Sequence, residues 1–496
     1  MPPHFLGTVT KRAVTCAFLF TLTLLSPLYA QEKGYLPFYS SDTTRVYELA
    51  VTLRTSLKNH FVVPTDVSAA YRNSYNEVVA KAAESSYWRA RNYALLDQTV
   101  DPYIQAIFKE VVEADSDLPE TRLVLTRSPV ENAHAQADGT VFFNIGLLAK
   151  MDNESQVAFI ICHELAHIKL KHMERGIKES LDAFYSKSFK QQLKQTAREK
   201  YNKRAKMEAL FGEFTLQKLY HKRSYEKQAD SLGYILLSKT KYNTADAYTT
   251  LQLLDKIDEP YSSQELDFNT LFSCSDSKFK FESKPKTSSI FDVSDTEPAF
   301  SDNPDTLKTH PDCQVRMRSI QELQPAVAAQ RNSPINHYLI PDRIRTISRN
   351  EVVQTYFDTK NYDYALFYAL LLLKDQPDNA YLKNIAMLCL YELKNHLQMH
   401  RFAEVVSVES SYQPDNFNQL LQVLHHLNIS DFKGISSCFS QAMQTEQETN
   451  EYAMAALYAS AVLREDTTVA EEIKKAYLAK YIQGRFAKKL FPTSLK

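Results

Sequence analysis

Glycine is scarce in this chain: nine residues of 496 are glycine, and neither GxGxxG nor GxxxxGK[ST] occurs anywhere. Loops of these two kinds need glycine so that backbone N–H groups can approach the phosphates of a nucleotide. The sequence therefore argues against Rossmann and P-loop chemistry.

An excess of one charge and long hydrophobic runs are absent as well. The 58 Lys and Arg residues nearly balance 59 Asp and Glu, for a formal net charge of -1, so we expect no nucleic-acid partner. Beyond residue 30 no stretch reaches the 18 apolar residues that suggest a transmembrane helix. A hydrophobic fraction of 44% is typical of a globular protein, and 496 residues imply at least two domains.

The first thirty residues differ from the rest of the chain. Lys11 and Arg12 precede an apolar run over 13–25, and the string "LYA" ends at Ala30. A basic region, a short apolar region and a small residue at the cleavage point are typical of a secretory signal peptide. We therefore predict a signal peptide over 1–30 and an exported protein; an uncleaved membrane anchor is the competing interpretation.

Cysteine is also sparse. Five of the six cysteines would remain after cleavage at residue 30, and an odd number leaves at least one thiol outside any disulfide. Cys274 and Cys313 flank one loop-like region and are a candidate disulfide, which the sequence alone does not prove. So few cysteines exclude a disulfide-stabilised scaffold.

The hydrophobic pattern predicts an α+β chain that is mostly helical. Residues 42–115 have a helical period, whereas 121–128 and 139–146 are short, rich in β-formers and indicate strands, joined by turn residues. The strand at 139–146 is the expected edge along which an extended substrate would pair. A helix follows, with Asn153 a plausible beginning.

The later part of the chain divides into two regions. Residues 261–308 mix Ser, Asp, Lys and Pro without periodicity, which predicts an irregular loop or lid. From 345 to 496 the pattern is helical again, and the string "QPDN" occurs twice. This region is predicted to form tetratricopeptide-like helical repeats, with plain helical hairpins as the alternative.

The string "HELAH" at 163–167 carries the strongest chemical signal. His163 and His167 are four residues apart, so on a helix both imidazoles project from one face and can reach one ion. Glu164 can reach a water on that ion, which is the arrangement of two ligands and a general base in the H-E-x-x-H zinc motif. His172 is five residues beyond His167, the wrong spacing for a ligand, so a structural role is expected. A buried polar helix without a metal is the alternative.

A third ligand is needed, because catalytic zinc usually has three protein ligands and one open position. The string "SYEKQADSLG" places Glu226 and Asp230 one helical turn apart. We predict that Glu226 is the third ligand of one zinc ion per chain, and that Asp230 accepts the free N–H of a ligand histidine. In the alternative interpretation both carboxylates lie on a solvated helix face.

These motifs carry a resemblance to a known family. "HELAH" followed about sixty residues later by "ExxxD" resembles the gluzincin metallopeptidases of the M48 family, and the likeness extends over roughly residues 45–325. The string "THPDCQVRMRSI" resembles a later element of that family. By this resemblance His310 or Arg316 would stabilise the oxyanion, or His310 would occupy the open zinc position as a reversible plug.

The order of the regions adds to the resemblance. A signal peptide, an M48-like domain over 31–330 and repeats over 345–496 resemble the periplasmic BepA-type proteases, which take part in envelope protein quality control. This likeness implies a periplasmic zinc endopeptidase, with Glu164 as general base, acting on unfolded or misassembled proteins that the repeats recruit. It leaves room for peripheral membrane association. The alternatives are a catalytically silent chaperone or assembly scaffold and, less well supported because no GxMEN-type string occurs, a zinc aminopeptidase.

Overall fold

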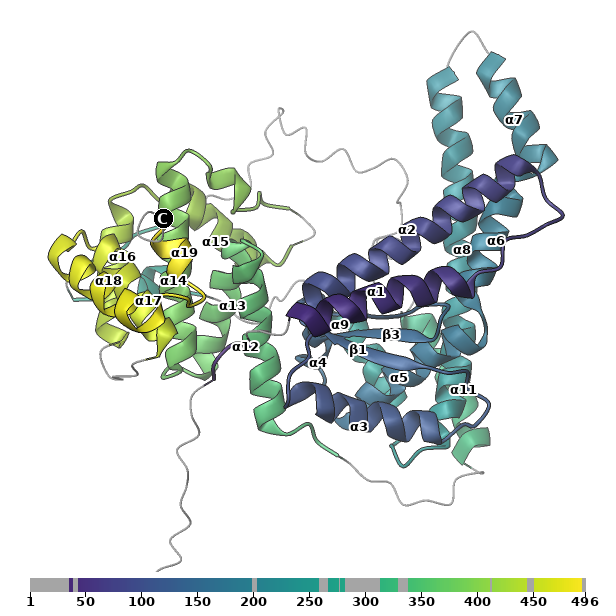
Figure 1. Cartoon of the computed structure of the whole chain (residues 1–496), viewed down its shortest axis with the longest axis horizontal. Helices are drawn as coiled ribbons and strands as arrows, with labels where there is room; N and C mark the ends of the chain where they lie inside the picture. The colour runs from purple at the N-terminus through teal and green to yellow at the C-terminus, as the bar shows by residue number, and fades with distance from the viewer. Residues whose placement is uncertain are drawn as a thin grey trace, which may run out of the picture. The chain divides into compact units, whose positions relative to one another are not determined.

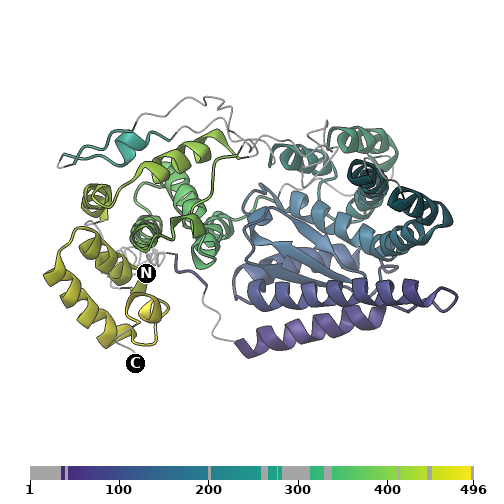
Figure 2. The same ribbon diagram turned by 90° about the horizontal axis from the view of Figure 1, so that it is seen from above.

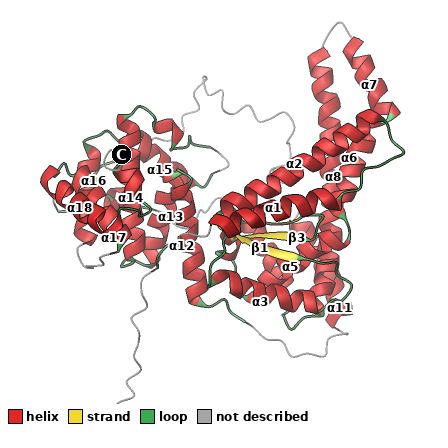
Figure 3. Ribbon diagram, in the orientation of Figure 1, coloured by secondary structure: helices red, strands yellow, loops and turns green. Residues whose placement is uncertain are grey.

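The chain is mostly helical, with one small sheet, in a computed structural model (Figures 1 and 3). This confirms the predicted α+β class. The structure describes residues 35–38, 43–198, 203–257, 266–275, 277–281, 313–328, 338–410, 413–443 and 450–492. The predicted signal peptide, His310 and most of 261–308 lie outside the described residues.

A mixed three-stranded sheet lies at the centre of the first part of the chain. The strands are β1 (Arg122–Thr126), β2 (Ala133–Ala135) and β3 (Thr140–Asn144), in the order β1-β3-β2. β3 pairs parallel to β1 and antiparallel to β2. The two predicted strands are present, but a third was missed between them. β3 is therefore central, so the expectation that it forms the edge is wrong: β2 is the edge beside it.

Helices cover both faces of this sheet (Figure 2). Phe142 and Val124 face α1 (Thr43–His60) and α2 (Ala69–Tyr93), whereas Val141 and Phe143 belong to the core formed with α3 and α5. The alternation follows from the strand period of two, which sends successive side chains to opposite faces. The helices from α3 to α8 are α3 (Val100–Glu113), α4 (Ile145–Leu148), α5 (Glu154–Lys169), α6 (His172–Tyr185), α7 (Lys187–Arg198) and α8 (Lys203–Ser238).

The α5 helix begins where the sequence predicts. The Asn153 side chain accepts a hydrogen bond from the backbone N–H of Gln156 and so caps the helix. Nearly all of α5 is buried, since the helix packs between the sheet and α8. Polar residues on such a helix need partners, and those of its second half find them in α8.

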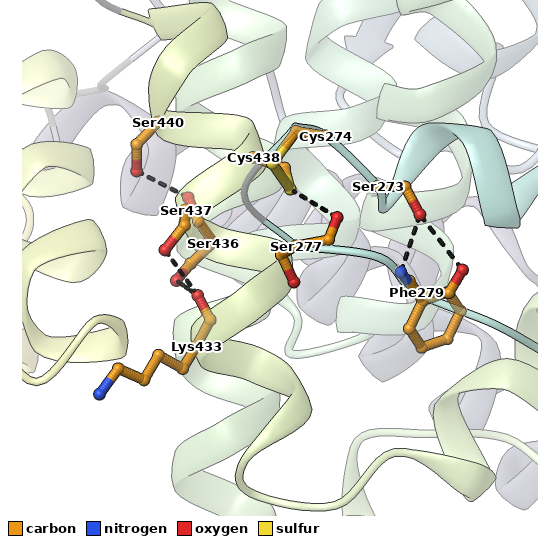
Figure 4. Close-up of a disulfide and its surroundings, with 9 residues drawn as sticks. All are labelled: Ser273, Cys274, Ser277, Phe279, Lys433, Ser436, Ser437, Cys438 and Ser440. Atoms are coloured by element: carbon orange, nitrogen blue, oxygen red, sulfur yellow. Dashed lines mark hydrogen bonds between the residues drawn. A yellow bond between two sulfur atoms is a disulfide. The ribbon is translucent and has the colours of Figure 1, made fainter.

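The region after α8 begins with α9 (Asp246–Ile257), α10 (Phe268–Leu271) and α11 (Cys313–Ala328). A disulfide joins Cys274, just after α10, to Cys438 in α16 (Asp431–Met443; Figure 4). The candidate pairing of Cys274 with Cys313 is therefore wrong. Cys313 is buried in the core that contains α5, whereas the Cys274 segment packs on α16, where Phe272 contacts Phe439. Cys162, Cys313 and Cys389 are buried and not disulfide-bonded.

The last part of the chain is a series of packed helices. Neighbours in the series lie against each other, for example α13 on α14 and α17 on α18; the tetratricopeptide class of these helices stays a prediction. None of the helices among the described residues is long and apolar enough to cross a membrane. The elements are α12 (Asp342–Asp358), α13 (Tyr362–Asp375), α14 (Ala380–Gln398), η3 (Phe402–Glu404), α15 (Asp415–His426), α16 (Asp431–Met443), α17 (Glu451–Leu463), α18 (Thr467–Tyr481) and α19 (Ala487–Leu490).

Candidate metal centre

Two helices cross closely at Gly233, and this crossing builds the centre. A Cβ atom at Gly233 would lie 3.0 Å from both Cα and N of His163, so α8 can lie this close to α5 only with glycine at the contact. Glu226, Asp230 and Gly233 are spaced i, i+4, i+7 and therefore share one face of α8. The crossing consequently brings both carboxylates to the histidines of α5.

The three predicted ligands come together in the structure. His163 Nε2 lies 3.1 Å from His167 Nε2 and 3.4 Å from Glu226 Oε2, and His167 Nε2 lies 3.6 Å from Glu226 Oε1. Donors about 2.0–2.1 Å from a tetrahedral zinc ion lie about 3.3 Å apart. Three lone-pair donors that face one another at these separations fit one zinc ion.

Asp230 lies behind His163. Its Oδ1 is 2.9 Å from His163 Nδ1, the ring nitrogen that faces away from the cluster of donors. Burial alone would lower the pKa of His163, but the carboxylates of Asp230 and Glu226 outweigh it and raise that pKa to about 10. Burial and the neighbouring His163 lower the pKa of His167 to about 3. The donor set thus favours one positive charge at His163 and disfavours a second at His167.

Arg316, on α11, anchors the two carboxylates. Its Nε and Nη2 donate to Asp230 at 2.6 and 2.8 Å, and its Nη1 lies 3.5 Å from Glu226 Oε2. Burial would raise the pKa of Asp230, but Arg316 and His163 keep it below its ordinary value. In this arrangement Arg316 holds the ligand set in place, a role different from the oxyanion contact that the resemblance implies for it.

Glu164 lies beside the three donors and lines the same cavity. Burial raises the pKa of its carboxyl group to about 7, against the opposing effect of His163. The backbone N–H of Ala135 in β2 also donates to this carboxylate. A carboxyl group with a pKa near neutrality is suited to both accepting and returning a proton.

His172 contacts the site in a way that the sequence did not predict. The α5 helix ends at Lys169, Lys171 adopts left-handed backbone angles with φ of 53°, and α6 begins at His172. This reversal brings His172 Nδ1 within 2.8 Å of His167 Nδ1. His172 Nε2 in turn lies 3.3 Å from Gln228 Oε1, and the ring stacks on Tyr225 at 4.4 Å. His172 therefore orients His167, within the structural role expected of it.

A cavity of about 320 Å³ opens beside the donors, and the 132–137 segment that contains β2 forms one wall. The residues of this segment predict a turn, because a three-residue Ala-His-Ala strand has few β-formers. Gly233 did carry a usable signal: it is one of nine glycines, placed at i+7 from Glu226. His310 lies outside the described residues.

Comparison with known proteins agrees with this geometry. No curated protein sequence matches the chain. Residues 98–324 match the model of Peptidase family M48, a range that contains all three donors together with Glu164, Asp230 and Arg316. Members of this family are zinc-dependent peptidases. The chain therefore carries a metallopeptidase domain of peptidase family M48.

Proposed function

We propose that this chain is an exported zinc-dependent endopeptidase that cleaves unfolded or misassembled polypeptides. The observation that carries the proposal is the convergence of His163, His167 and Glu226 beside Glu164, in a cavity whose wall is a sheet edge. A binding scaffold would gain nothing from a buried set of donors that Asp230 and Arg316 hold in place.

A zinc ion held by His163, His167 and Glu226 would supply a Lewis acid that polarises the scissile carbonyl. Glu164 accepts a proton from the attacking water and later donates it to the nitrogen of the leaving amine. Its raised pKa favours this exchange near neutral pH, because neither protonation state is strongly disfavoured. Asp230 and His172 orient the two ligand histidines through their Nδ1 atoms.

Endopeptidase activity is supported by the wall of the cavity. An extended peptide can pair with the edge strand β2 and continue past the site in both directions, because backbone pairing reads little sequence. An aminopeptidase would need an acidic group to bind the free amine. Apart from Glu164 and Glu226, the described residues that line the cavity include one further carboxylate, that of Glu174. Glu174 lies 3.0 Å from His60 Nε2 and is therefore already engaged with another side chain, which argues against an amine-binding role.

Export is supported by two observations. The pattern of residues 1–30 is typical of a signal peptide, and the Cys274–Cys438 disulfide suits an oxidising compartment such as the periplasm. We further propose that the helices from α12 to α19 recruit substrate or partner proteins, and that the enzyme acts in envelope protein quality control.

The test is cleavage of a reduced, unfolded protein by the zinc-loaded wild type and by Glu164→Gln. We expect internal cuts by the wild type, whereas the variant should keep its zinc and lose cleavage by about 100-fold or more. A wild type that binds zinc but does not cut would favour the scaffold. Release of single N-terminal residues would indicate an aminopeptidase.

A further inference from the structure

The α7 helix carries four basic residues, Lys187, Lys190, Lys194 and Arg198, and no acidic one. The whole chain has a formal net charge of -1, so without these four charges it would be at -1 - 4 = -5. At about 100° per residue the four side chains fall within an arc of about 80°. We call these four residues the basic stripe.

The basic stripe faces solvent, because the opposite side of α7 is the one that packs. Each of the four stripe residues is exposed, whereas Phe189 is buried and Leu193 half-buried. Both apolar residues lie on the far side of the helix, where α7 contacts α6 and α8. Figure 1 shows α7 beside the first part of α8, in a hairpin that extends beyond the sheet.

Neighbouring groups add to the positive charge. Arg204 and Lys206, near the beginning of α8, are also exposed. The three carboxylates of α6 have neighbours elsewhere: Asp182 accepts from Lys178 and Tyr71, Glu174 lies against His60, and Glu179 lies beside Tyr225. Among the residues that the structure describes, none of these α6 carboxylates is therefore paired with the basic stripe.

We propose that the basic stripe docks the enzyme on the surface of an anionic lipid bilayer. A line of cations along one arc of a projecting helix can face a plane of phosphate headgroups all at once. Without the stripe the chain is acidic overall, so the stripe would orient the enzyme on the bilayer.

The composition favours a lipid surface over other polyanions. Three of the four stripe residues are lysines, which act as point charges, whereas recognition of nucleic acid or of a carboxylate favours the forked guanidinium of arginine.

The test is flotation of the full mature chain with vesicles of neutral phosphatidylcholine, alone or with about 30% anionic phosphatidylglycerol. We expect binding to the anionic vesicles alone, with loss of binding at about 0.5 M salt. Each basic side chain near such a surface contributes about 1 kcal/mol, or about fivefold. Replacement of all four stripe residues by glutamine should therefore lower the partition coefficient by about 100-fold or more.

The matched control replaces four exposed lysines of the last helices, Lys374, Lys433, Lys475 and Lys488, by glutamine. This variant has the same net charge, and we expect nearly wild-type vesicle binding. Both variants should keep their zinc and cleave a soluble substrate normally. Equal losses of vesicle binding in the two variants, or a wild type that ignores anionic vesicles, would overturn the proposal. Stripe-dependent binding to poly-glutamate without vesicle binding would also overturn it, in favour of an acidic protein partner.

Discussion

Replacement of Arg316 by methionine tests whether this residue anchors the carboxylates or contacts the reacting carbonyl. Arg316 is 4% exposed and Asp230 1%, and the guanidinium makes a two-point contact with Asp230 and approaches Glu226. Removing one partner from a buried ion pair costs about 3–5 kcal/mol, because the remaining charge has no counterion. We therefore expect Arg316→Met to lower the free energy of unfolding by about 3–5 kcal/mol without metal.

Zinc changes this result in a direction that can be stated. Without Arg316 the two carboxylates keep, among the described residues, only His163 as a cationic neighbour. A divalent cation bound by Glu226 restores positive charge beside them, so saturating zinc should recover part of the loss. The gain in stability on adding zinc should thus be larger in Arg316→Met than in the wild type. Urea denaturation with chelator and with excess zinc measures both quantities.

The control is Arg318→Met, because Arg318 is an exposed arginine two residues away on the same helix. It should change the unfolding free energy by less than about 0.5 kcal/mol. A loss below about 1 kcal/mol in Arg316→Met without metal, together with a large fall in kcat, would refute the anchoring role. That outcome would restore the oxyanion role implied by resemblance.

Three further predictions concern Gly233, His172 and His134. Gly233→Ala should destabilise the protein by about 1–3 kcal/mol in urea denaturation because its Cβ meets the backbone of α5. Gly176→Ala, where there is room for a Cβ, should instead stabilise by about 0.5–1 kcal/mol; equal effects would contradict the close crossing. His172→Phe preserves a ring to stack on Tyr225 but removes the acceptor for His167, so chelator competition should show a zinc affinity about 10–100-fold lower. His172→Asn should restore that affinity. An unchanged affinity in His172→Phe would contradict the orienting role. Burial and Arg89 lower the pKa of His134 to about 3, whereas its value in the unfolded chain is about 6.5. Between these two pH values the unfolded chain therefore binds more protons than the folded one. The free energy of unfolding should fall as the pH drops from 6.5 towards 3, by up to about 1.4 kcal/mol per pH unit. Urea unfolding of His134→Gln at pH 7 and 5 should show a flatter profile, and identical profiles would rule out this contribution.

The α5 helix and the grouping of His163 with His167 were predictable because their signals are local. Helical spacing places His163 and His167 on one face, and Asn153 has the side chain that caps a helix. The prediction of Glu226 as the third ligand followed from the coordination chemistry of zinc, because catalytic zinc usually has three protein ligands. These inferences need only the period of a helix and the usual number of protein ligands of a catalytic zinc ion.

What failed depends on contacts distant in sequence or on unusual backbone angles. The residues around Lys171 do not predict a left-handed backbone conformation, so one continuous helix was expected there. A continuous helix would not bring His172 into contact with His167. The partner of Cys274 lies 164 residues away at Cys438, and the spacing of cysteines does not determine connectivity. The strand β2 forms because β3 and α5 lie beside it, and its own residues have little preference for a strand.

The most direct test of the metal centre is zinc content measured together with cleavage in the wild type and in Glu164→Gln. Three donors held by α5 and α8 predict one zinc per chain in both proteins. Glu164 as the proton carrier predicts cleavage of an unfolded protein by the wild type and almost none by the variant. Undiminished cleavage by the zinc-loaded variant, or a wild type without zinc that still cuts, would contradict the account.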